Sequence, residues 1–207
     1  MLYVCATPIG NLADITLRAL EVLKNADIIL CEDTRNSQKL LSHHGIINKK
    51  LVALHEHNEN EVSQNVVQWL EQNLTIVQVS DAGTPGISDP GARLCNILAS
   101  HNIYPHPLPG ACAYITLLSV SGTVSTPSLF FGFLPSKTSQ RQKQLLLWQE
   151  VDYAVALYES PHRICDCLKD IIQVLGDDRM LVMGRELTKQ FETIRKCSAG
   201  ELLQFVE

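Results

Sequence analysis

The sequence predicts an α/β protein of two domains, in which a mostly parallel sheet with flanking helices is followed by a smaller mixed α/β domain. Three observations support this fold class. Short apolar runs alternate with amphipathic helical patterns through residues 1–121. Several of these runs end in turns rich in glycine, proline and polar residues. Near the end of the chain, two apolar runs follow one another without a helical pattern between them, which is typical of a mixed sheet.

The first domain, residues 1–121, is expected to carry buried parallel strands because its apolar runs are short and nearly continuous. The expected strands are Leu2–Ala6, Ile28–Cys31, Leu51–Leu54, Thr75–Val79 and Tyr104–Leu108. The expected helices are Ile15–Lys24, Ser37–His44, Glu61–Gln72, a helix opened by Asp89 and Pro90 that runs to His101, and Ala113–Val120. The first apolar run lacks a basic flank, so we interpret it as a strand and not as a signal peptide.

The second domain, residues 122–207, follows a linker that we place at 119–128, where the composition changes to small residues. Its expected strands are Leu129–Phe133, Tyr153–Tyr158, Met180–Arg185 and Glu192–Cys197. Ser139 with Gln142 predicts a capping box that opens one helix, and Ser198 with Glu201 predicts another. Ser160 and Pro161 predict the start of a helix that ends near Leu175.

The composition limits the class of protein. With 207 residues, 45% of them hydrophobic, the chain is long enough for a substantial core, and no apolar stretch reaches membrane-spanning length. The formal net charge of −5 argues against a broad phosphate-binding surface, although Lys137–Lys143 could form a local basic patch. The seven cysteines are an odd number, and most lie in apolar patterns. We therefore expect buried free thiols and a cytoplasmic protein.

The most informative stretch is the loop at residues 80–91, which reads Ser-Asp-Ala-Gly-Thr-Pro-Gly-Ile-Ser-Asp-Pro-Gly. It follows a predicted buried strand and is longer than a simple connection needs. Glycine and proline fix an unusual backbone path and leave main-chain groups free to face a ligand. Ligands of α/β sheets bind at the carboxyl ends of strands. The loop therefore predicts a small-molecule site.

Two other turns after strands share this character. Thr7–Asn11 follows the first strand, and it matches neither the dinucleotide nor the nucleoside-triphosphate glycine motif. Leu108–Cys112 places small residues at the start of a helix, where a ligand can approach closely. Each turn alone is also compatible with a plain strand-to-helix junction.

Polar clusters follow several other strands. Glu32–Arg35 could bind a polar substrate or form a solvated turn with a local ion pair. His55–His57 raises the question of a metal, but no partner recurs at ligand spacing, so we expect no metal. Tyr158–Arg163 and Gly184–Lys189 each gather reactive polar side chains at the end of a strand. Surface capping is the alternative for both, and two such loops in one small domain favour a role in the site.

Eight motifs in this order resemble a known family. They are Thr-Pro-Ile-Gly-Asn (7–11), Glu-Asp-Thr-Arg (32–35), His-Glu-His-Asn-Glu (55–59), the loop at 80–91, Leu-Pro-Gly (108–110), Gly-Phe-Leu-Pro (132–135), Tyr-Glu-Ser-Pro-His-Arg (158–163) and Arg-Glu-Leu-Thr-Lys (185–189). The chain resembles the ribosomal RNA small-subunit methyltransferase I family, cytidine 2′-O-ribose methyltransferases of the tetrapyrrole methylase superfamily. The resemblance covers the whole chain.

The resemblance implies a two-domain tetrapyrrole-methylase-like fold that binds S-adenosyl-L-methionine between its domains and acts as a homodimer. The family's cofactor turns correspond here to Pro8, Ile9, Gly10, Asp81, Ala82, Gly83, Thr84, Gly110, Ala111, Cys112 and Ala113. Cys112 stands where relatives often have a small polar residue, so only backbone contacts are expected there. The family continues past the position of Glu207, so we expect the second domain to be truncated.

The remaining motifs would face the acceptor RNA or an assembled ribosomal subunit. Glu32, His57 and Glu159 are the side chains that could take a proton from a ribose hydroxyl, and Arg35 is placed with them as catalytic. Arg163, Arg185 and Lys189 are expected to bind the RNA. Two alternatives stay open. One is a tetrapyrrole (precorrin-type) C-methyltransferase, and the other is a non-catalytic cofactor-binding or RNA-binding assembly factor.

Overall fold

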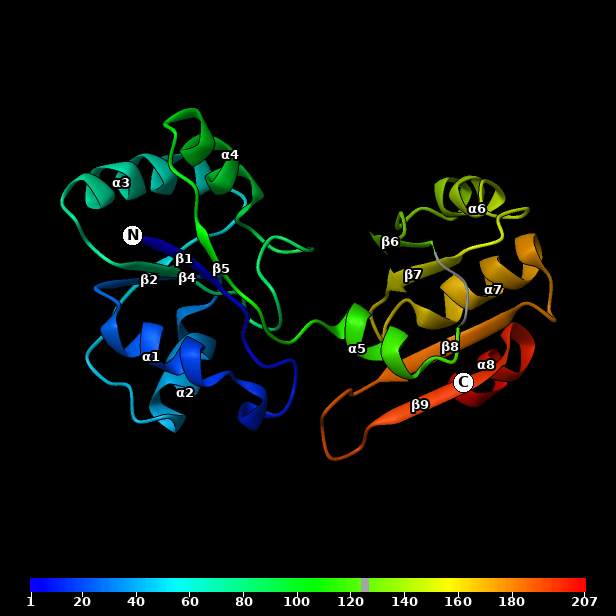
Figure 1. Cartoon of the computed structure of the whole chain (residues 1–207). Coiled ribbons are helices and arrows are strands. Elements are labelled where there is room, and N and C mark those ends of the chain that lie inside the picture. Colours follow the sequence, from blue (N-terminus) through cyan, green and yellow to red (C-terminus); the bar gives the residue numbers. More distant parts are fainter. Residues whose placement is uncertain (124–126) are drawn as a thin grey trace. The chain divides into compact units, whose positions relative to one another are not determined.

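The computed structural model describes residues 1–123 and 127–207, which form two compact units (Figure 1). The first unit is Met1–Ala113 and the second is Tyr114–Glu207. This division differs from the predicted boundary after residue 121, because helix α5 (Ala113–Val120) packs within the second unit. The Tyr114 hydroxyl lies 2.6 Å from Ser128 Oγ, and its ring stacks on Phe130. The predicted linker at 119–128 lies partly outside the described residues.

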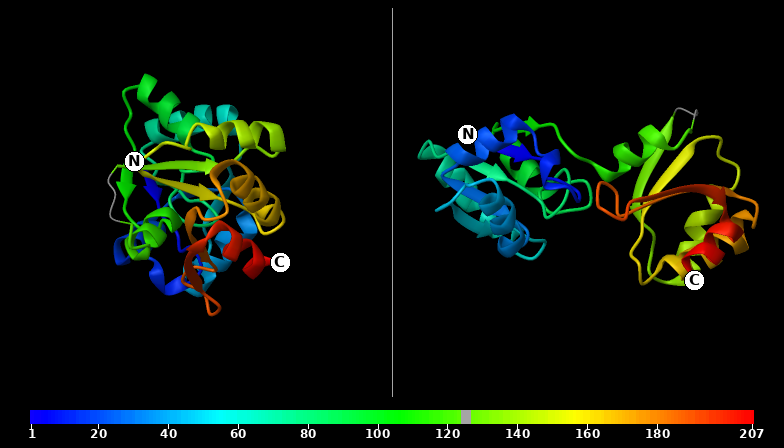
Figure 2. Two further views of the ribbon diagram at one scale, coloured as in Figure 1. Left: turned by 90° about the vertical axis from the view of Figure 1, so that its right-hand side faces the viewer. Right: turned by 90° about the horizontal axis from the view of Figure 1, so that it is seen from below.

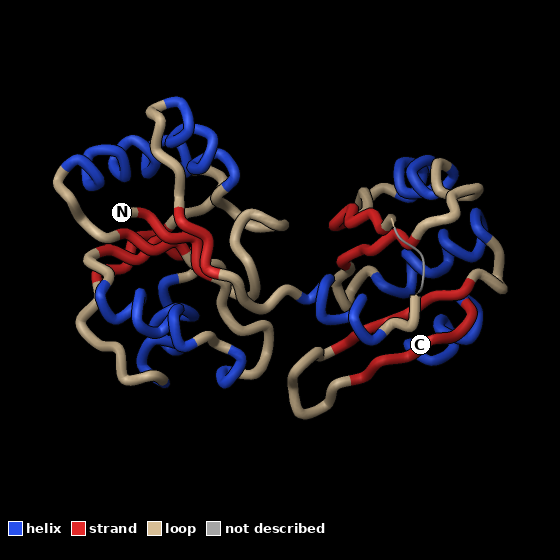
Figure 3. Tube along the Cα trace, in the orientation of Figure 1, coloured by secondary structure: helices blue, strands red, loops and turns tan. Residues whose placement is uncertain are grey.

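The first unit contains a five-stranded sheet in the order β3-β2-β4-β1-β5, and every strand pair is parallel. Figure 3 shows its strands in red between helices in blue. The strands are β1 (Leu2–Cys5), β2 (Ile28–Cys31), β3 (Lys50–Ala53), β4 (Ile76–Gln78) and β5 (His106–Leu108). All five lie where the sequence predicted strands, which confirms the parallel sheet. Because β4 lies between β2 and β1, the loops that follow these three strands meet at one edge of the sheet.

Helices cover both faces of this sheet (Figure 2). The helices are α1 (Leu17–Asn25), α2 (Thr34–His43), α3 (Glu59–Glu71) and α4 (Ala92–Ser100), and a short 3-10 turn, η1 (Leu12–Asp14), precedes α1. Alternate residues of β2 point to opposite sides: Ile29 packs with α1 and α2, and Leu30 packs with α3 and α4. Both residues are fully buried, as expected for strands covered on two faces.

Two helix starts in this unit differ from the sequence prediction. Helix α2 begins at Thr34 and not at Ser37, because the Asp33 carboxylate caps it and accepts a hydrogen bond of 2.8 Å from the Arg35 amide. Helix α4 begins at Ala92, and Gly91 is its N-cap residue instead of the predicted Asp89. A side chain from another helix supplies the acceptor for this end of α4, which a local sequence pattern could not indicate.

The second unit combines a parallel strand pair with an antiparallel pair, which confirms a mixed α/β arrangement. Its strands are β6 (Ser128–Phe133), β7 (Ala154–Tyr158), β8 (Met180–Arg185) and β9 (Thr193–Ser198), and its other helices are α6 (Thr138–Leu146), α7 (Ile164–Leu175) and α8 (Ala199–Val206). Strands β6 and β7 are parallel, and β8 and β9 form a hairpin. One apolar core, centred on Leu145, Leu168 and Leu202, joins the three helices.

The capping predictions in this unit had different outcomes. The capping box of Ser198 and Glu201 is confirmed, with both reciprocal hydrogen bonds present at the start of α8. The box predicted for Ser139 and Gln142 is wrong. Helix α6 begins at Thr138, and the Gln142 amide instead donates to Asp170 of α7 at 2.7 Å. Packing between the two helices therefore uses the side chain that local capping would have needed.

Helix α7 also begins later than predicted. Ser160 and Pro161 lie in a turn, and the helix proper starts at Ile164. The Ser160 carbonyl accepts hydrogen bonds from the amides of Arg163 and Ile164, so the turn leads directly into the helix. None of the helices within residues 1–123 and 127–207 has the length and apolar composition that crossing a membrane requires.

Candidate active site

The loops that follow β1 and β4 are joined by main-chain hydrogen bonds. The Thr7 amide donates to the Gly83 carbonyl at 2.9 Å, and the Gly83 amide donates back to the Thr7 carbonyl at 3.1 Å. The buried Thr7 hydroxyl also donates to the Ser80 carbonyl, and the Ser80 hydroxyl donates to Gly83. These bonds fix the first part of the 80–91 loop against the turn at 7–11.

The turn after β5 is held against the same two loops. The Thr84 hydroxyl donates to the Ala111 carbonyl at 3.0 Å. A Cβ atom on Gly110 would lie 2.7 Å from the Ala6 Cβ, so only glycine allows this close approach. Gly83 has φ +88°, and a Cβ there would lie 3.3 Å from Ile9 Cγ2. The structure thus brings the three predicted cofactor turns together at the carboxyl ends of β4, β1 and β5.

Asp81 connects the 80–91 loop to the loop after β2. One carboxylate oxygen accepts a hydrogen bond of 3.1 Å from the Asp33 amide, and the other accepts 2.8 Å from the Asn36 side chain. Sequence reasoning missed Asn36, because it sits on the first turn of α2 just beyond the Glu32–Arg35 motif. The predicted cofactor loop and the predicted acceptor motif are therefore parts of one hydrogen-bonded structure.

Asp33 and Arg35 form a bidentate ion pair. The Arg35 Nη2 atom lies 2.7 Å from Asp33 Oδ2, and its Nε donates to Oδ1 at 3.1 Å. The side-chain hydrogen bond from Arg35 lowers the pKa of Asp33 from 3.8 to about 2. The Arg35 side chain is 85% exposed, so its guanidinium is held at the surface of the loop. Asp33 thus both caps α2 and orients the arginine.

The carboxyl edge of the sheet is acidic. The pKa of Glu32 is raised, first by burial and then by the negative charges of Asp81, Asp89, Glu56 and Asp33. The pKa of Asp89 is raised by burial and by Asp81, although a hydrogen bond from Ser80 opposes the shift. These carboxyl groups come from the loops after β2, β3 and β4. This acidic rim, defined by Glu32, Asp33, Glu56, Asp81 and Asp89, favours a cationic ligand.

The histidine-rich segment is a turn and not a continued strand. Strand β3 ends at Ala53, and His55 and His57 are exposed with their ring centroids 6.0 Å apart. The Asn58 side chain shapes the turn, since it accepts a hydrogen bond from the His55 amide and donates to the Ala53 carbonyl. Among residues 1–123 and 127–207, no group of three or more histidine, cysteine, aspartate or glutamate side chains is placed so that it could hold a metal ion.

In the second unit, Glu159 and Arg163 pair at the end of β7. The Arg163 Nη2 atom lies 3.3 Å from Glu159 Oε2 and donates to the Leu134 carbonyl at 2.7 Å. The other Glu159 oxygen accepts a hydrogen bond from the Ser160 amide. The Glu159 side chain is only 7% exposed. The structure therefore brings these two predicted residues together, and Arg163 also holds the loop after β6.

A second arginine supports the same loop from within the core. Arg141 is 3% exposed, and its Nε donates to Asp170 at 2.5 Å. The guanidinium also donates to the carbonyls of Pro135 and Ser136. The Gly-Phe-Leu-Pro motif thus owes its shape to two arginines. One of them, Arg141, was expected to belong to a basic patch at 137–143, but the structure buries it against Asp170, so it is not part of such a surface. An arginine on the apolar face of α6 was the signal that could have indicated this burial.

Arg185 and Lys189 lie on the β8–β9 hairpin. Lys189 pairs with Glu186 at 3.0 Å within the hairpin loop. The Arg185 and Arg195 guanidinium carbons lie 5.8 and 4.4 Å from the centroid of the Phe205 ring. Within the described residues, neither arginine has a carboxylate partner. This arginine–aromatic cluster, defined by Arg185, Arg195 and Phe205, is suited to binding an anion.

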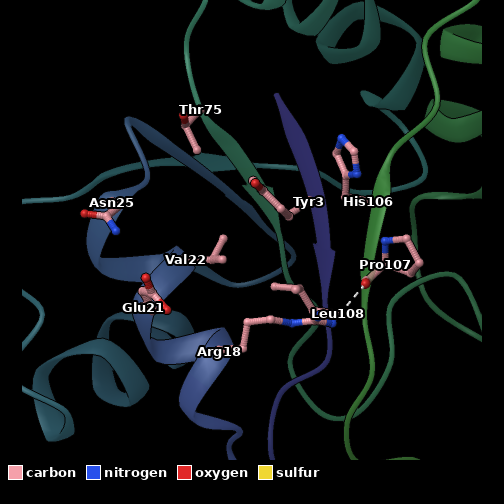
Figure 4. Close-up of a pocket in the computed structure, with 9 residues that line it drawn as sticks. All are labelled: Tyr3, Arg18, Glu21, Val22, Asn25, Thr75, His106, Pro107 and Leu108. Atoms are coloured by element: carbon pink, nitrogen blue, oxygen red, sulfur yellow. Dashed lines mark hydrogen bonds between the residues drawn. The ribbon is translucent and has the colours of Figure 1, made fainter.

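A cavity of about 510 Å³ lies elsewhere in the first unit, beside α1 and β5 (Figure 4). The Arg18 side chain crosses it and donates to the Pro107 carbonyl at 3.5 Å. Thr75, at the amino end of β4, also lines it. Leu108, the first residue of the turn 108–112, lines the cavity, but none of the residues predicted to bind the cofactor or the acceptor does.

The fold and the joined turns define an α/β protein with a candidate ligand site at the carboxyl edge of a parallel sheet. The family profile described as Tetrapyrrole (Corrin/Porphyrin) Methylases matches residues 1–203. The chain therefore belongs to the tetrapyrrole methylase family of methyltransferases.

Three relatives show where the chain falls within this family, and each is named "Ribosomal RNA small subunit methyltransferase I". The protein from Vibrio cholerae serotype O1 is 49% identical over all of this chain and 71% of its own length. The protein from Escherichia coli O157:H7 is 48% identical over all of this chain and 72% of its own length. The Haemophilus influenzae protein is 50% identical over 94% of this chain and 68% of its own length.

Two solved structures share the fold at low sequence identity. A cobalt precorrin-4 methyltransferase aligns with a TM-score of 0.68 and 16% identity over 99% of this chain and 88% of its own. The uroporphyrin III C-methyltransferase of Thermus thermophilus aligns with a TM-score of 0.67 and 16% identity over 100% of this chain and 91% of its own. At this identity the likeness establishes the fold alone, and it confirms the predicted tetrapyrrole-methylase-like architecture.

Proposed function

We propose that the chain is an S-adenosyl-L-methionine-dependent methyltransferase that modifies a cytidine ribose 2′-hydroxyl in small-subunit ribosomal RNA. The observation that carries this proposal is the joining of three glycine-containing turns beside an acidic rim. It is supported by relatives that are 48–50% identical and are named as small-subunit ribosomal RNA methyltransferases.

The three joined turns suit S-adenosyl-L-methionine as the cofactor. Pro8, Ile9, Gly10 and Gly110 to Ala113 would surround it with small side chains and main-chain groups, and Asp81 to Thr84 would form the wall between them. The cofactor carries a positive sulfonium, which the acidic rim favours electrostatically. Cys112, half-buried, would contribute its main chain. No nucleotide-phosphate loop is needed, because this ligand has no phosphate.

The bound cofactor would supply a methyl group that is already activated, so the protein needs chiefly to align the acceptor and accept its proton. Glu32 suits the proton transfer best, since its raised pKa makes its carboxylate a stronger base. His57 lies on the exposed turn after β3 and stays a second candidate. Glu159 is a weaker one, because Arg163 and the Ser160 amide already hold its carboxylate.

Basic side chains would bind the RNA backbone. Arg35 is exposed and oriented by Asp33, which suits contact with a phosphate near the reacting ribose. Arg185 and Lys189 lie on the β8–β9 hairpin and would extend the contact. The Arg163 side chain is only 31% exposed, against 85% for Arg35, so its contribution would be smaller. We further propose a homodimer that acts in the cytoplasm, on RNA or on an assembled subunit.

A tetrapyrrole acceptor is the alternative within the same family. The two structural neighbours carry such names, but they are only 16% identical to this chain. The relatives at 48–50% identity carry the ribosomal RNA name, which favours RNA.

The test is a methylation assay with cofactor labelled on its methyl group. The acceptors are small ribosomal subunits that lack the modification, their extracted RNA, and free precorrin. We expect label in RNA, at a linkage that resists alkaline hydrolysis because the 2′-hydroxyl is blocked. Arg35→Ala should lose this activity while keeping cofactor affinity in a calorimetric titration. Label in precorrin alone would establish the alternative, and cofactor binding without any transfer would indicate an assembly factor.

A further inference from the structure

We infer that Glu59 is a positioning residue for the cofactor, because it fixes the far end of the 80–91 loop from helix α3. The inference rests on the proposed function, since it concerns how tightly this loop holds S-adenosyl-L-methionine. Glu59 lies in the stretch His-Glu-His-Asn-Glu, where sequence reasoning singled out the histidines. The structure gives the last residue of that stretch a different and more direct connection to the loop.

Glu59 caps a helix to which it does not belong. Its side chain is buried, and its Oε1 atom accepts hydrogen bonds from the amides of Gly91 at 2.9 Å and Leu94 at 3.1 Å. Helix α4 has no capping side chain of its own at Gly91. Within the described residues, no basic side chain pairs with Glu59. The positive end of α4 therefore balances this buried carboxylate.

The residues held by Glu59 end the glycine-rich loop. Gly91 has φ +131°, and a Cβ there would lie 1.9 Å from the Gln78 side-chain nitrogen. That nitrogen donates to the Pro90 carbonyl at 2.9 Å. Gln78 and Glu59 together define the path of the chain at Pro90 and Gly91. The near end of the loop is defined by Thr7 and Asp81, which lie in the predicted cofactor turns.

Glu59 is itself placed by the turn after β3. It is the first residue of α3 and directly follows Asn58, whose side chain bonds to the His55 amide and the Ala53 carbonyl. The Ser63 hydroxyl donates to the Glu59 carbonyl at 2.5 Å, which anchors the first turn of the helix. A continuous set of contacts thus runs from the end of β3 to the end of the cofactor loop.

The test compares cofactor binding by Glu59→Ala, Glu59→Gln and Glu61→Ala in the full chain. Glu61 is an exposed carboxylate on the same helical turn, so its variant is the matched control. Glu59→Ala should raise the calorimetric Kd for S-adenosyl-L-methionine by about tenfold or more, because two buried amides lose their acceptor. Glu59→Gln keeps a carbonyl acceptor, so its Kd should stay within about threefold of the wild type. Glu61→Ala should bind as the wild type does.

Further measurements separate positioning from general stability. Hydrogen exchange at the amides of Gly91 and Leu94 should accelerate in Glu59→Ala, and turnover at saturating cofactor should fall much less than affinity. A lower melting temperature with an unchanged Kd would overturn the positioning role. If Glu59→Ala does not fold, Glu59→Asp gives the same test, because its shorter side chain withdraws the carboxylate from both amides. Wild-type protein that binds no cofactor would overturn the proposed function, whereas equal binding by wild type and variant overturns only this inference.

Discussion

Asp81 joins two loops through one carboxylate. Its effect on cofactor binding through the structure of these loops can therefore be separated from the effect of any direct contact with the cofactor. We expect Asp81→Ala to raise the Kd for S-adenosyl-L-methionine by about tenfold, because the loop loses the bonds to Asn36 and the Asp33 amide. Asn36→Ala should weaken binding less. In a double-mutant cycle the two effects should not add, since both variants break the same contact. Full additivity in calorimetric titrations would show that Asp81 acts independently of Asn36.

Glu32 should make stability depend on pH in a direction opposite to that of most carboxylates. Its pKa is raised in the folded chain, so the folded state binds this proton more tightly than the unfolded state does. The resulting stabilisation is complete below the ordinary pKa of 4.5 and is lost as the pH rises through the raised value. Glu32→Gln should therefore melt at a higher temperature than the wild type near pH 7, and the difference should vanish near pH 4.

The measurement is a pair of thermal unfolding curves at each pH, with Glu61→Gln as the control for loss of one exposed carboxylate. An equal melting-temperature difference at both pH values would mean that the acidic rim does not perturb Glu32. Glu32→Gln should also lose methyl transfer if Glu32 accepts the ribose proton. A gain in stability together with a loss of activity is the expected signature of a charge kept for function.

Single residues show where sequence reasoning stops. Gly83 and Gly110 were predictable as positions of close approach, because glycine after a buried strand signals that another part of the chain packs tightly there. The contacts of Asn36 and Glu59 were not predictable, because their partners lie far away in the chain. Glu59 does belong to the motif at 55–59, but the pattern there pointed to the histidines. Gln78 did carry a signal, since it is a polar side chain inside an otherwise apolar strand.

At the scale of helices and strands, local signals succeeded where the contacts are local. The capping box of Ser198 and Glu201 lies within one turn, and the sequence predicted it correctly. The start of α4 was misplaced because a carboxylate on α3 replaces the cap that Asp89 would have supplied. The strands were found more reliably than the helix starts, because their burial requires apolar side chains wherever they pair.

A prediction about the junction of a loop and a helix concerns Gly91, which ends the 80–91 loop and precedes α4. Its φ of +131° is strained for any other residue, and a Cβ would meet the Gln78 amide. Gly91→Ala should lower the free energy of unfolding by about 3 kcal/mol. Gly45→Ala is the matched control, since Gly45 also has positive φ but no atom lies near its Cβ position. Its cost should be about 1 kcal/mol. Urea denaturation measures both, and equal costs would show that the Gln78 contact is unimportant.

At the scale of the whole molecule, the fold class followed from the alternation of apolar runs and helical patterns. The parallel sheet of the first unit and the mixed strands of the second were both predictable. The packing of α5 was less predictable. Its apolar sequence gives no preferred face, and its packing partners, such as Gly184, are far away in the sequence. The charge distribution was only partly predictable, because the candidate basic patch was placed at 137–143, where the structure buries Arg141. The chain is acidic overall, yet four basic and two acidic residues share the stretch 185–196.

This local excess of positive charge determines how an acidic protein should bind RNA. Arg185 shares the Phe205 ring with Arg195 and has no carboxylate partner among the described residues, so a phosphate would relieve the repulsion between the two guanidinium groups. Arg185→Ala should weaken binding of a single-stranded oligoribonucleotide and reduce the slope of log K against log salt by about 0.7, which corresponds to one phosphate contact.

Lys24→Ala is the control for this measurement, because it removes an equal charge from the last turn of α1. Anisotropy titrations at several salt concentrations give both slopes. Equal slopes for the two variants would mean that RNA responds only to the net charge of the chain. A smaller slope for Arg185→Ala alone, with unchanged affinity for S-adenosyl-L-methionine, would assign the arginine–aromatic cluster to the acceptor RNA. The hairpin would then contribute to RNA binding independently of the cofactor, whereas Arg35 lies on a loop that is bonded to the cofactor turn through Asp81.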